Sequence, residues 1–162
     1  MKSGSPIKSF RDLRGKTVVV TTGTTNEQTM RDIAKKFGIE YRLVPARDHA
    51  DSFAQVAEGR ADAFASDDVL LYGLIARNQA RGQYHVVGEF LSYDPYGIMY
   101  RKGDRQLARL VADTFRFLAE DGEVHAQYRQ WFLRRLPGGG SIDLPMSPQL
   151  EALVEAMAAK PE

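Results

Sequence analysis

The chain has 162 residues, enough for one domain with a substantial core, and its 43% hydrophobic and 27% charged residues are ordinary for a globular protein. A net charge of +1 gives no electrostatic reason to expect nucleic acid or an anionic membrane as a partner. The absence of cysteine excludes disulfides and thiolate metal sites, and residues 1–6 lack the apolar core of a signal peptide.

The first clear pattern is a strand, a turn and a helix over residues 17–38. An apolar run predicts a strand at 17–21, and the hydroxyl-rich turn that follows contains Gly23. Thr24 and Glu27 have the spacing of a capping box, and Gly38 is expected to end the helix in the left-handed conformation. The helix presents one apolar face, made of Met30, Ile33, Ala34 and Phe37.

Alternation of strands and helices continues to about residue 102. Four more strands are expected, at 41–44, 61–65, 84–87 and 96–100, and Pro45 is expected to stop the first of these four. Helices are expected after a loop at 46–50 and again after a cap at 66–68. The pattern predicts an α/β fold: a Rossmann-like lobe with a mostly parallel, five-stranded sheet and helices on both faces.

The character of the sequence changes after residue 102. Two amphipathic helices are predicted at 105–119 and 123–133, and a linker rich in glycine and proline precedes a last helix. We therefore predict three parts: a lobe at 5–102, a helical segment at 103–136, and the linker with its helix at 137–162.

Three loops are expected to meet at the carboxyl edge of the sheet, where open α/β sheets bind their ligands. They are Thr21–Thr25, Ala46–His49 and Ser66–Asp68. The first supplies N–H groups and hydroxyls for an anion, the second supplies His49 as a titratable donor, and the third supplies the Asp67 carboxylate for an ammonium group. Together they predict a pocket for a zwitterion such as an amino acid.

Simpler interpretations of the same residues stay open on local pattern. Thr24 and Thr25 are also what a helix cap requires, Asp67 also suits an N-cap, and a single loop histidine such as His49 is often only a surface residue. Enzyme motifs are weaker still. The turn after the first strand lacks the glycine spacing of a dinucleotide fold and of a phosphate-binding P-loop, and the ligands near residue 48 are too few for zinc. We expect no metal and no cofactor.

Several segments together resemble a known family. They are residues 7–20 with Gly23-Thr24-Thr25, residues 44–53, residues 66–71 and residues 96–102. These segments resemble the second lobe of family 3 solute-binding proteins, the periplasmic receptors of amino-acid ABC importers, and in particular the glutamate/aspartate-binding branch. The resemblance implies a type II periplasmic-binding-protein-like lobe without catalysis, a periplasmic location and ABC membrane subunits as partners.

The resemblance also implies roles for individual residues. Thr24 and Thr25, following Gly23, would bind the side-chain carboxylate of glutamate or aspartate, and Thr21 would line the same pocket. His49 would add a donor to that carboxylate, and Asp67 would pair with the ligand ammonium group. Most of the family's first lobe has no counterpart here, so we expect a truncated protein that carries half of the site and binds ligand weakly or not at all.

The helices at 105–133 resemble those that pack on the missing lobe. Their apolar residues are Leu107, Leu110, Val111, Phe115, Leu118, Tyr128, Trp131 and Phe132. Exposing so much apolar surface would forgo several kcal/mol, at about 25 cal/mol per Å². We therefore expect a homodimer through 105–133, with exchange of 105–162 between chains as one form of it, or docking onto another protein. A dehydratase-like enzyme using His49 and Asp67, or a regulatory module, is the alternative.

Overall fold

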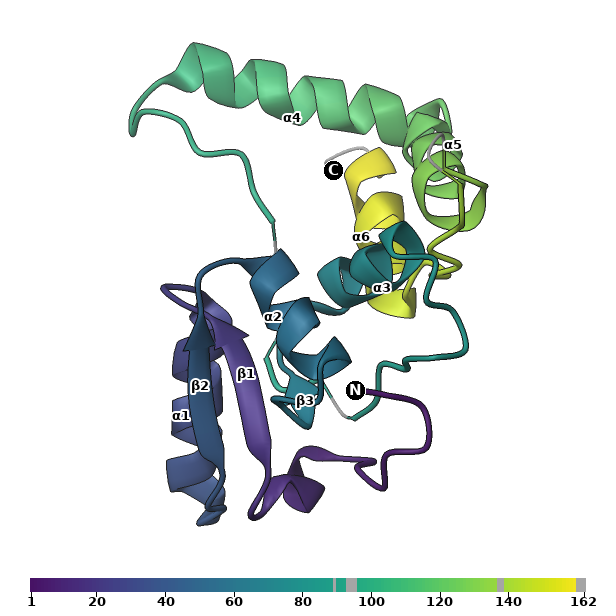
Figure 1. Ribbon diagram of the computed structural model, residues 1–162. Coiled ribbons are helices and arrows are strands. Elements are labelled where there is room, and N and C mark those ends of the chain that lie inside the picture. Colours follow the sequence, from purple (N-terminus) through teal and green to yellow (C-terminus); the bar gives the residue numbers. More distant parts are fainter. Residues whose placement is uncertain (89, 93–95, 137–138, 160–162) are drawn as a thin grey trace. The chain divides into compact units, whose positions relative to one another are not determined.

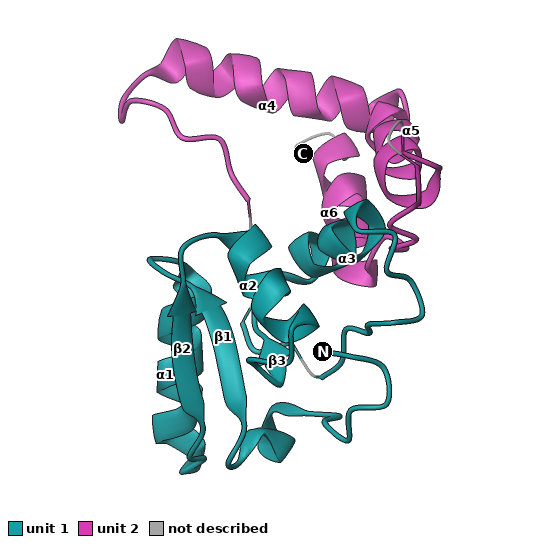
Figure 2. Cartoon of the chain, in the orientation of Figure 1, with its two compact units in different colours: residues 1–94 teal, residues 95–162 magenta. Residues whose placement is uncertain are grey.

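The computed structural model describes residues 1–88, 90–92, 96–136 and 139–159. The chain divides into two compact units, Met1–Asp94 and Pro95–Glu162 (Figure 2). Unit 1 contains every strand that the described residues form, and unit 2 is helical. The candidate binding residues named above all lie in unit 1.

Unit 1 alternates strands and helices, as the sequence predicts (Figure 1). In chain order its elements are η1 (Phe10–Leu13), β1 (Thr17–Thr21), α1 (Thr25–Phe37), β2 (Arg42–Ala46), α2 (His49–Ala57), β3 (Ala63–Phe64) and α3 (Asp68–Arg77). The strands form a parallel sheet in the order β2-β1-β3, with Thr21 opposite Ala46. The predicted α/β lobe with a parallel sheet is therefore confirmed.

Side chains of β1 alternate between two cores, which explains why helices cover both faces of the sheet. Val18 and Val20 pack in one core with Met30 and Ile33 of α1. Val19 packs in the other core, with Val56 of α2 and with Phe64. Thr21 shares the direction of Val19, so the last residue of β1 points toward α2. This parity places a hydroxyl beneath the first turn of α2.

Helix α1 begins and ends where the sequence predicts, but the details of its cap differ. Thr24 is the N-cap residue, yet its hydroxyl donates to the Thr21 carbonyl (2.8 Å) instead of accepting from the helix. The helix ends at Gly38, which has a φ of 60°, and the Ile39 N–H donates to the Ala34 carbonyl as in a left-handed C-terminal cap.

The expected count of five strands is wrong, because the sheet has three strands in the described part of the chain. In the predicted strand 84–87, only Tyr84 forms bridges, to Lys2 and to Arg81, and two single bridges do not make a ladder. The predicted strand 96–100 has no strand assignment. A strand needs a neighbour to accept its backbone hydrogen bonds, and these described residues find none in a ladder.

Two further expectations for unit 1 need correction. Pro45 does not stop the second strand, since β2 continues to Ala46; this is permitted because β2 lies at the edge of the sheet, where a missing N–H costs no ladder bond. His49 is not in a loop but is the first residue of α2, which Asp48 caps by accepting from the Asp51 N–H (2.8 Å).

Unit 2 contains α4 (Arg105–Glu120), α5 (Glu123–Tyr128), the π-helix η2 (Arg129–Leu133) and α6 (Pro148–Ala158). The helix predicted at 123–133 is thus two segments, α5 followed by the π-helical turn. The predicted linker begins at residues 137–138, which lie outside the described residues. Among the residues described, no helix combines the length and the apolar character that crossing a membrane requires.

Candidate binding site

The three turns that carry the predicted site residues lie at the carboxyl edge of the sheet. Parallel pairing aligns the ends of β1 and β2 at Thr21 and Ala46, and β3 ends at Phe64 on the other side of β1. The turn after β1 is tied to β2, because the Thr22 N–H and hydroxyl both donate to the Ala46 carbonyl, at 2.9 and 3.0 Å. This edge is where ligands bind in open α/β sheets.

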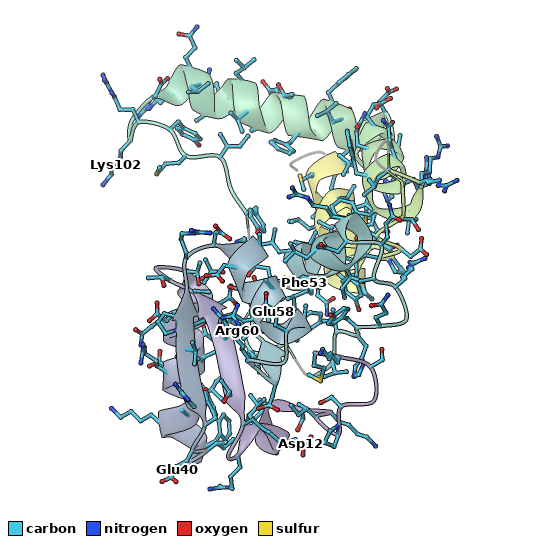
Figure 3. The ribbon with its side chains drawn as sticks, in the orientation of Figure 1. Asp12, Glu40, Phe53, Glu58, Arg60 and Lys102 are labelled. Atoms are coloured by element: carbon cyan, nitrogen blue, oxygen red, sulfur yellow. The ribbon has the colours of Figure 1, made fainter. Side chains whose placement is uncertain are left out.

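Charged residues at the amino edge of the sheet are far from these turns. Asp12 and Glu40 lie at that opposite edge, as Figure 3 shows. Asp12 accepts from the backbone N–H groups of Lys8 and Ser9, at 2.9 and 3.0 Å, and so closes the capping box of η1. These two backbone hydrogen bonds lower the pKa of Asp12. Asp12 therefore serves the fold rather than the candidate site.

The turn after β1 already holds one carboxylate of the protein itself. The Gly23 N–H donates to the Glu27 carboxylate at 3.1 Å, and Arg31 donates to the same carboxylate at 2.8 Å. The hydrogen bond from Arg31 and then that from Gly23 lower the pKa of Glu27. Gly23 has a φ of 75°, a left-handed conformation that suits glycine and turns its N–H toward the helix start.

Beyond Gly23, the turn keeps two donors. Within the described residues, the backbone N–H groups of Thr24 and Thr25 make no hydrogen bond. Both precede the first intrahelical hydrogen bond of α1, so they have no helical partner, and the helix dipole favours an anion at this position. The sequence predicted anion donors here, and the structure adds that Gly23 is not one of the unpaired donors.

His49 is held from below by the Thr21 hydroxyl, which in turn contacts the hydroxyl of Ser52. The Thr21 hydroxyl lies 2.6 Å from Nδ1 of His49 and 3.0 Å from the hydroxyl of Ser52. Thr21 is 8% exposed and Ser52 is fully buried, so neither forms the surface of the site. Thr21 supports His49 from beneath, and the expectation that it also lines the pocket stays a prediction.

Asp67 is held from the side by α1. The Asn26 amide donates to Oδ1 of Asp67 at 2.9 Å, which joins the turn after β1 to the turn after β3. Asp67 is the N-cap residue of α3, but its side chain makes no capping hydrogen bond. Its carboxylate therefore points toward α1 rather than serving its own helix. No local pattern marks Asn26 as a site residue, because its contact with Asp67 spans 41 residues.

The three turns thus bring together two backbone donors, an imidazole and a carboxylate. This set can bind an anion at the start of α1 and a cation at Asp67, while His49 can donate to an anion or accept from a neutral donor. In the described part of the chain, no group of three or more His, Cys, Asp or Glu side chains could hold a metal ion. Sequence reasoning missed the contacts of Ser52 and Asn26 with the predicted site residues, and it assigned Glu27 only a capping role although its carboxylate accepts from Gly23.

An open parallel sheet covered by helices, with its loops gathered at the carboxyl edge, defines the class of α/β ligand-binding lobes. Residues 1–135 match the family described as "ABC transporter, phosphonate, periplasmic substrate-binding protein". The chain therefore belongs to the periplasmic substrate-binding proteins of ABC transporters, as its resemblance to solute-binding proteins predicted.

Similar proteins of known name are amino-acid receptors. The chain is 37% identical over 162 residues to the L-glutamate/L-aspartate-binding protein of Pseudomonas aeruginosa, covering 98% of this chain and 53% of that protein. It is 36% identical over 156 residues to the glutamate/aspartate import solute-binding protein of Salmonella typhimurium, covering 96% and 52%. The chain thus spans about half the length of these curated relatives, which are solute-binding proteins and not enzymes.

A solved structure supports the fold independently. An ancestral arginine-binding protein bound to arginine superposes with a TM-score of 0.67 at 30% sequence identity, over 81% of this chain and 57% of that protein. The partial coverage agrees with a single lobe of a larger receptor. It also agrees with the predicted absence of a first lobe from the sequence given.

Proposed function

We propose that residues 5–102 form the ligand-binding lobe of an amino-acid receptor and carry half of a site for glutamate or aspartate. The observation that supports this most is the gathering of unpaired N–H groups, His49 and Asp67 at one sheet edge. The N–H groups of Thr24 and Thr25 would bind the side-chain carboxylate, His49 would donate to it, and Asp67 would bind the ammonium group. The names of the relatives favour an acidic amino acid.

The protein would act without catalysis, in the periplasm, as part of an ABC import system. The imidazole of His49 bonds to a hydroxyl, and no carboxylate in the described residues orients it as a general base would require. Delivery to membrane subunits of a transporter follows from the family and not from any contact in this chain.

Affinity in this chain alone should be low. A site that closes on one side leaves part of the ligand in water, and the ligand still loses its translational and rotational freedom on binding. We expect dissociation constants in the millimolar range for glutamate and aspartate, and no measurable binding of lysine, whose ammonium side chain would meet the N–H groups of Thr24 and Thr25.

An NMR titration of the ¹⁵N-labelled chain tests the proposal. Glutamate should shift the amide signals of Thr24 and Thr25 and the side-chain signals of His49, while lysine at equal concentration should not. Methylphosphonate serves as the competing anion, because the family description names phosphonate. If methylphosphonate shifts these signals and glutamate does not, the ligand is a phosphonate and not an amino acid. Submicromolar glutamate binding by a monomer would contradict the half-site.

We also propose that unit 2 mediates self-association into a homodimer. Helix α4 carries large apolar side chains that are exposed on this unit, including Leu110 at 62% and Phe117 at 63%. Exposed apolar patches of this kind mark interfaces. Sedimentation at micromolar concentration should give a dimer, and the double variant Leu110→Glu with Phe117→Glu should give a monomer. A wild-type chain that sediments as a monomer would refute this assembly.

A further inference from the structure

Thr21, Ser52 and the backbone of Asp48 form a chain of hydrogen bonds beneath His49. The Thr21 hydroxyl lies between Nδ1 of His49 (2.6 Å) and the Ser52 hydroxyl (3.0 Å). The Ser52 hydroxyl in turn lies 3.0 Å from the Asp48 carbonyl. We call these four groups the hydroxyl chain. Its two hydroxyl residues are buried, so no solvent proton competes within it.

The Asp48 carbonyl, at the end of the hydroxyl chain, determines which group donates and which accepts in each of its hydrogen bonds. Each hydroxyl has one proton to donate, and a carbonyl oxygen can only accept. If Ser52 donates to the Asp48 carbonyl, Ser52 must accept from Thr21, and Thr21 must accept from Nδ1 of His49. All three contacts are then hydrogen bonds.

The reverse direction is less favourable. If Thr21 donates to Nδ1, the single Ser52 proton can go to Thr21 or to the Asp48 carbonyl but not to both, so one pair of oxygens is left 3.0 Å apart with no proton between them. The Asp48 carbonyl also accepts from the Ser52 N–H at 2.9 Å, and its second lone pair accepts the Ser52 hydroxyl only in the forward direction or when the Thr21–Ser52 contact is left without a proton. One contact changes from attraction to repulsion, and the forward direction is preferred.

We propose that Ser52, acting through Thr21, holds His49 in the tautomer protonated on Nδ1 and thereby reserves Nε2 for the ligand. Ser52 is a positioning residue, since it does not contact the imidazole in any hydrogen bond of the described residues. The nitrogen left over, Nε2, has no hydrogen-bond partner in that same part of the chain. Which ring nitrogen carries the proton is set by the hydrogen bond that the other one makes.

This arrangement bears on the class of ligand, and that step rests on the proposed function. The Nδ1–H group donates to Thr21 whether the ring is neutral or charged, so the ring can take a proton on Nε2 without breaking the hydroxyl chain. A charged ring would donate from Nε2 to a ligand carboxylate, and a neutral ring would accept from a carboxamide. His49 can therefore bind a side-chain carboxylate when the ring is charged, or its amide when the ring is neutral.

Among the described residues, the contacts of the ring with other elements are to uncharged groups. From β1 its neighbour is the neutral Thr21, and from β3 it is Phe64, whose ring centre lies 6.2 Å away. The charged groups of its own turn are Asp48, Asp51 and Arg47, of which the Asp48 carboxylate accepts from the Asp51 N–H and from the Arg47 side chain. The carboxylate of Asp48 is thus engaged on the outside of the turn.

The tautomer can be read directly in the full, ligand-free chain. Long-range ¹H–¹⁵N correlation spectra distinguish Nδ1–H from Nε2–H rings, and the chain has only three histidines, so His49→Gln assigns the signal. At a pH well above the ordinary imidazole pKa of about 6.5, the wild type should be mainly Nδ1–H. Ser52→Ala should move the tautomer ratio toward Nε2–H by roughly fivefold, the equivalent of one net hydrogen bond.

Three variants control the experiment. Ser66→Ala removes another buried hydroxyl, one with no partner in the described structure, and should leave the ratio unchanged. Thr21→Val should shift the ratio as Ser52→Ala does, and Thr21→Ser should restore it. The Thr21 pair gives the answer even if Ser52→Ala fails to fold.

Two outcomes would overturn the proposal: a wild-type ring protonated on Nε2, or a ratio that neither Ser52→Ala nor Thr21→Val changes. Addition of glutamate to the same samples separates this proposal from the proposed function. If the ring is protonated on Nδ1 but its Nε2 signal does not shift when glutamate is added, the tautomer proposal stands. The same result would refute the proposed binding site.

Discussion

Ser52 and Ser66 allow a matched test of what a buried hydroxyl contributes to stability. Ser52 bonds to the Asp48 carbonyl and to the Thr21 hydroxyl, both at 3.0 Å, whereas the Ser66 hydroxyl is buried without a partner in the described structure. Two hydrogen bonds at about 0.5–1.5 kcal/mol each give about 1–3 kcal/mol for Ser52→Ala. The higher helix propensity of alanine offsets about 0.5 kcal/mol of this, leaving a net loss of about 0.5–2.5 kcal/mol.

Ser66→Ala should have the opposite sign. Folding removes the Ser66 hydroxyl from water and offers it no bond in return, which costs free energy. Its removal should be neutral or stabilise unit 1 by about 1 kcal/mol. The two variants should therefore differ by about 2 kcal/mol, or roughly 8–16 °C in Tm for a unit of this size.

The assay must report on unit 1 separately, because the chain has two compact units and need not unfold in one step. Hydrogen exchange of the β1 amides follows the opening of unit 1. Fluorescence of Trp131, the chain's single tryptophan, follows unit 2 and should be the same in both variants. Equal destabilisation by Ser52→Ala and Ser66→Ala would refute the reasoning, because it would mean that partners do not decide the cost of a buried hydroxyl.

Three other predictions follow from single contacts. Gly38→Ala should destabilise unit 1 by about 1 kcal/mol in urea unfolding because φ is 60° there, whereas Gly73→Ala inside α3 should stabilise it by about 0.5–1 kcal/mol; the same sign for both would contradict this. Hydrogen bonds lower the pKa of Asp12, so its contribution exists above the unfolded pKa of 3.8 and disappears as pH falls through the folded value. Acid unfolding of Asp12→Asn should therefore be less steep in that range, and an unchanged profile would refute this assignment. Asn26→Ala should weaken glutamate binding in the NMR titration roughly fivefold by removing the amide that donates to Asp67, and unchanged affinity would show that binding does not depend on this contact.

The parts of unit 1 that sequence reasoning predicted correctly are those whose signals are local. The apolar run of β1, the turn and the terminal glycine of α1 lie within 22 consecutive residues, 17–38, and each depends on its own neighbours. The meeting of three turns at one edge also followed, because parallel strands joined by helices all end on the same side.

The errors share a different cause, since they depend on partners remote in the chain. A strand at 96–100 exists only if another strand pairs with it, and nothing within that segment can decide this. The capping pattern of Thr24 and Glu27 was recognised, but the Glu27 carboxylate accepts from Gly23 rather than from Thr24. The contact of Thr21 with Ser52 joins residues 31 positions apart. Such contacts depend on which side chains of β1 face α2 and on how α2 packs against the sheet.

The remote contacts also bear on whether the proposed half-site can keep its shape without a second lobe. Each predicted ligand group is held by another residue of unit 1: His49 by Thr21, and Asp67 by Asn26. None of these contacts requires a second lobe, so the proposed half-site would already have its geometry before a ligand binds. What a second lobe would add is buried surface and further ligand contacts. Joining one to this chain should therefore raise affinity chiefly by slowing ligand release, while the positions of His49 and Asp67 stay as they are.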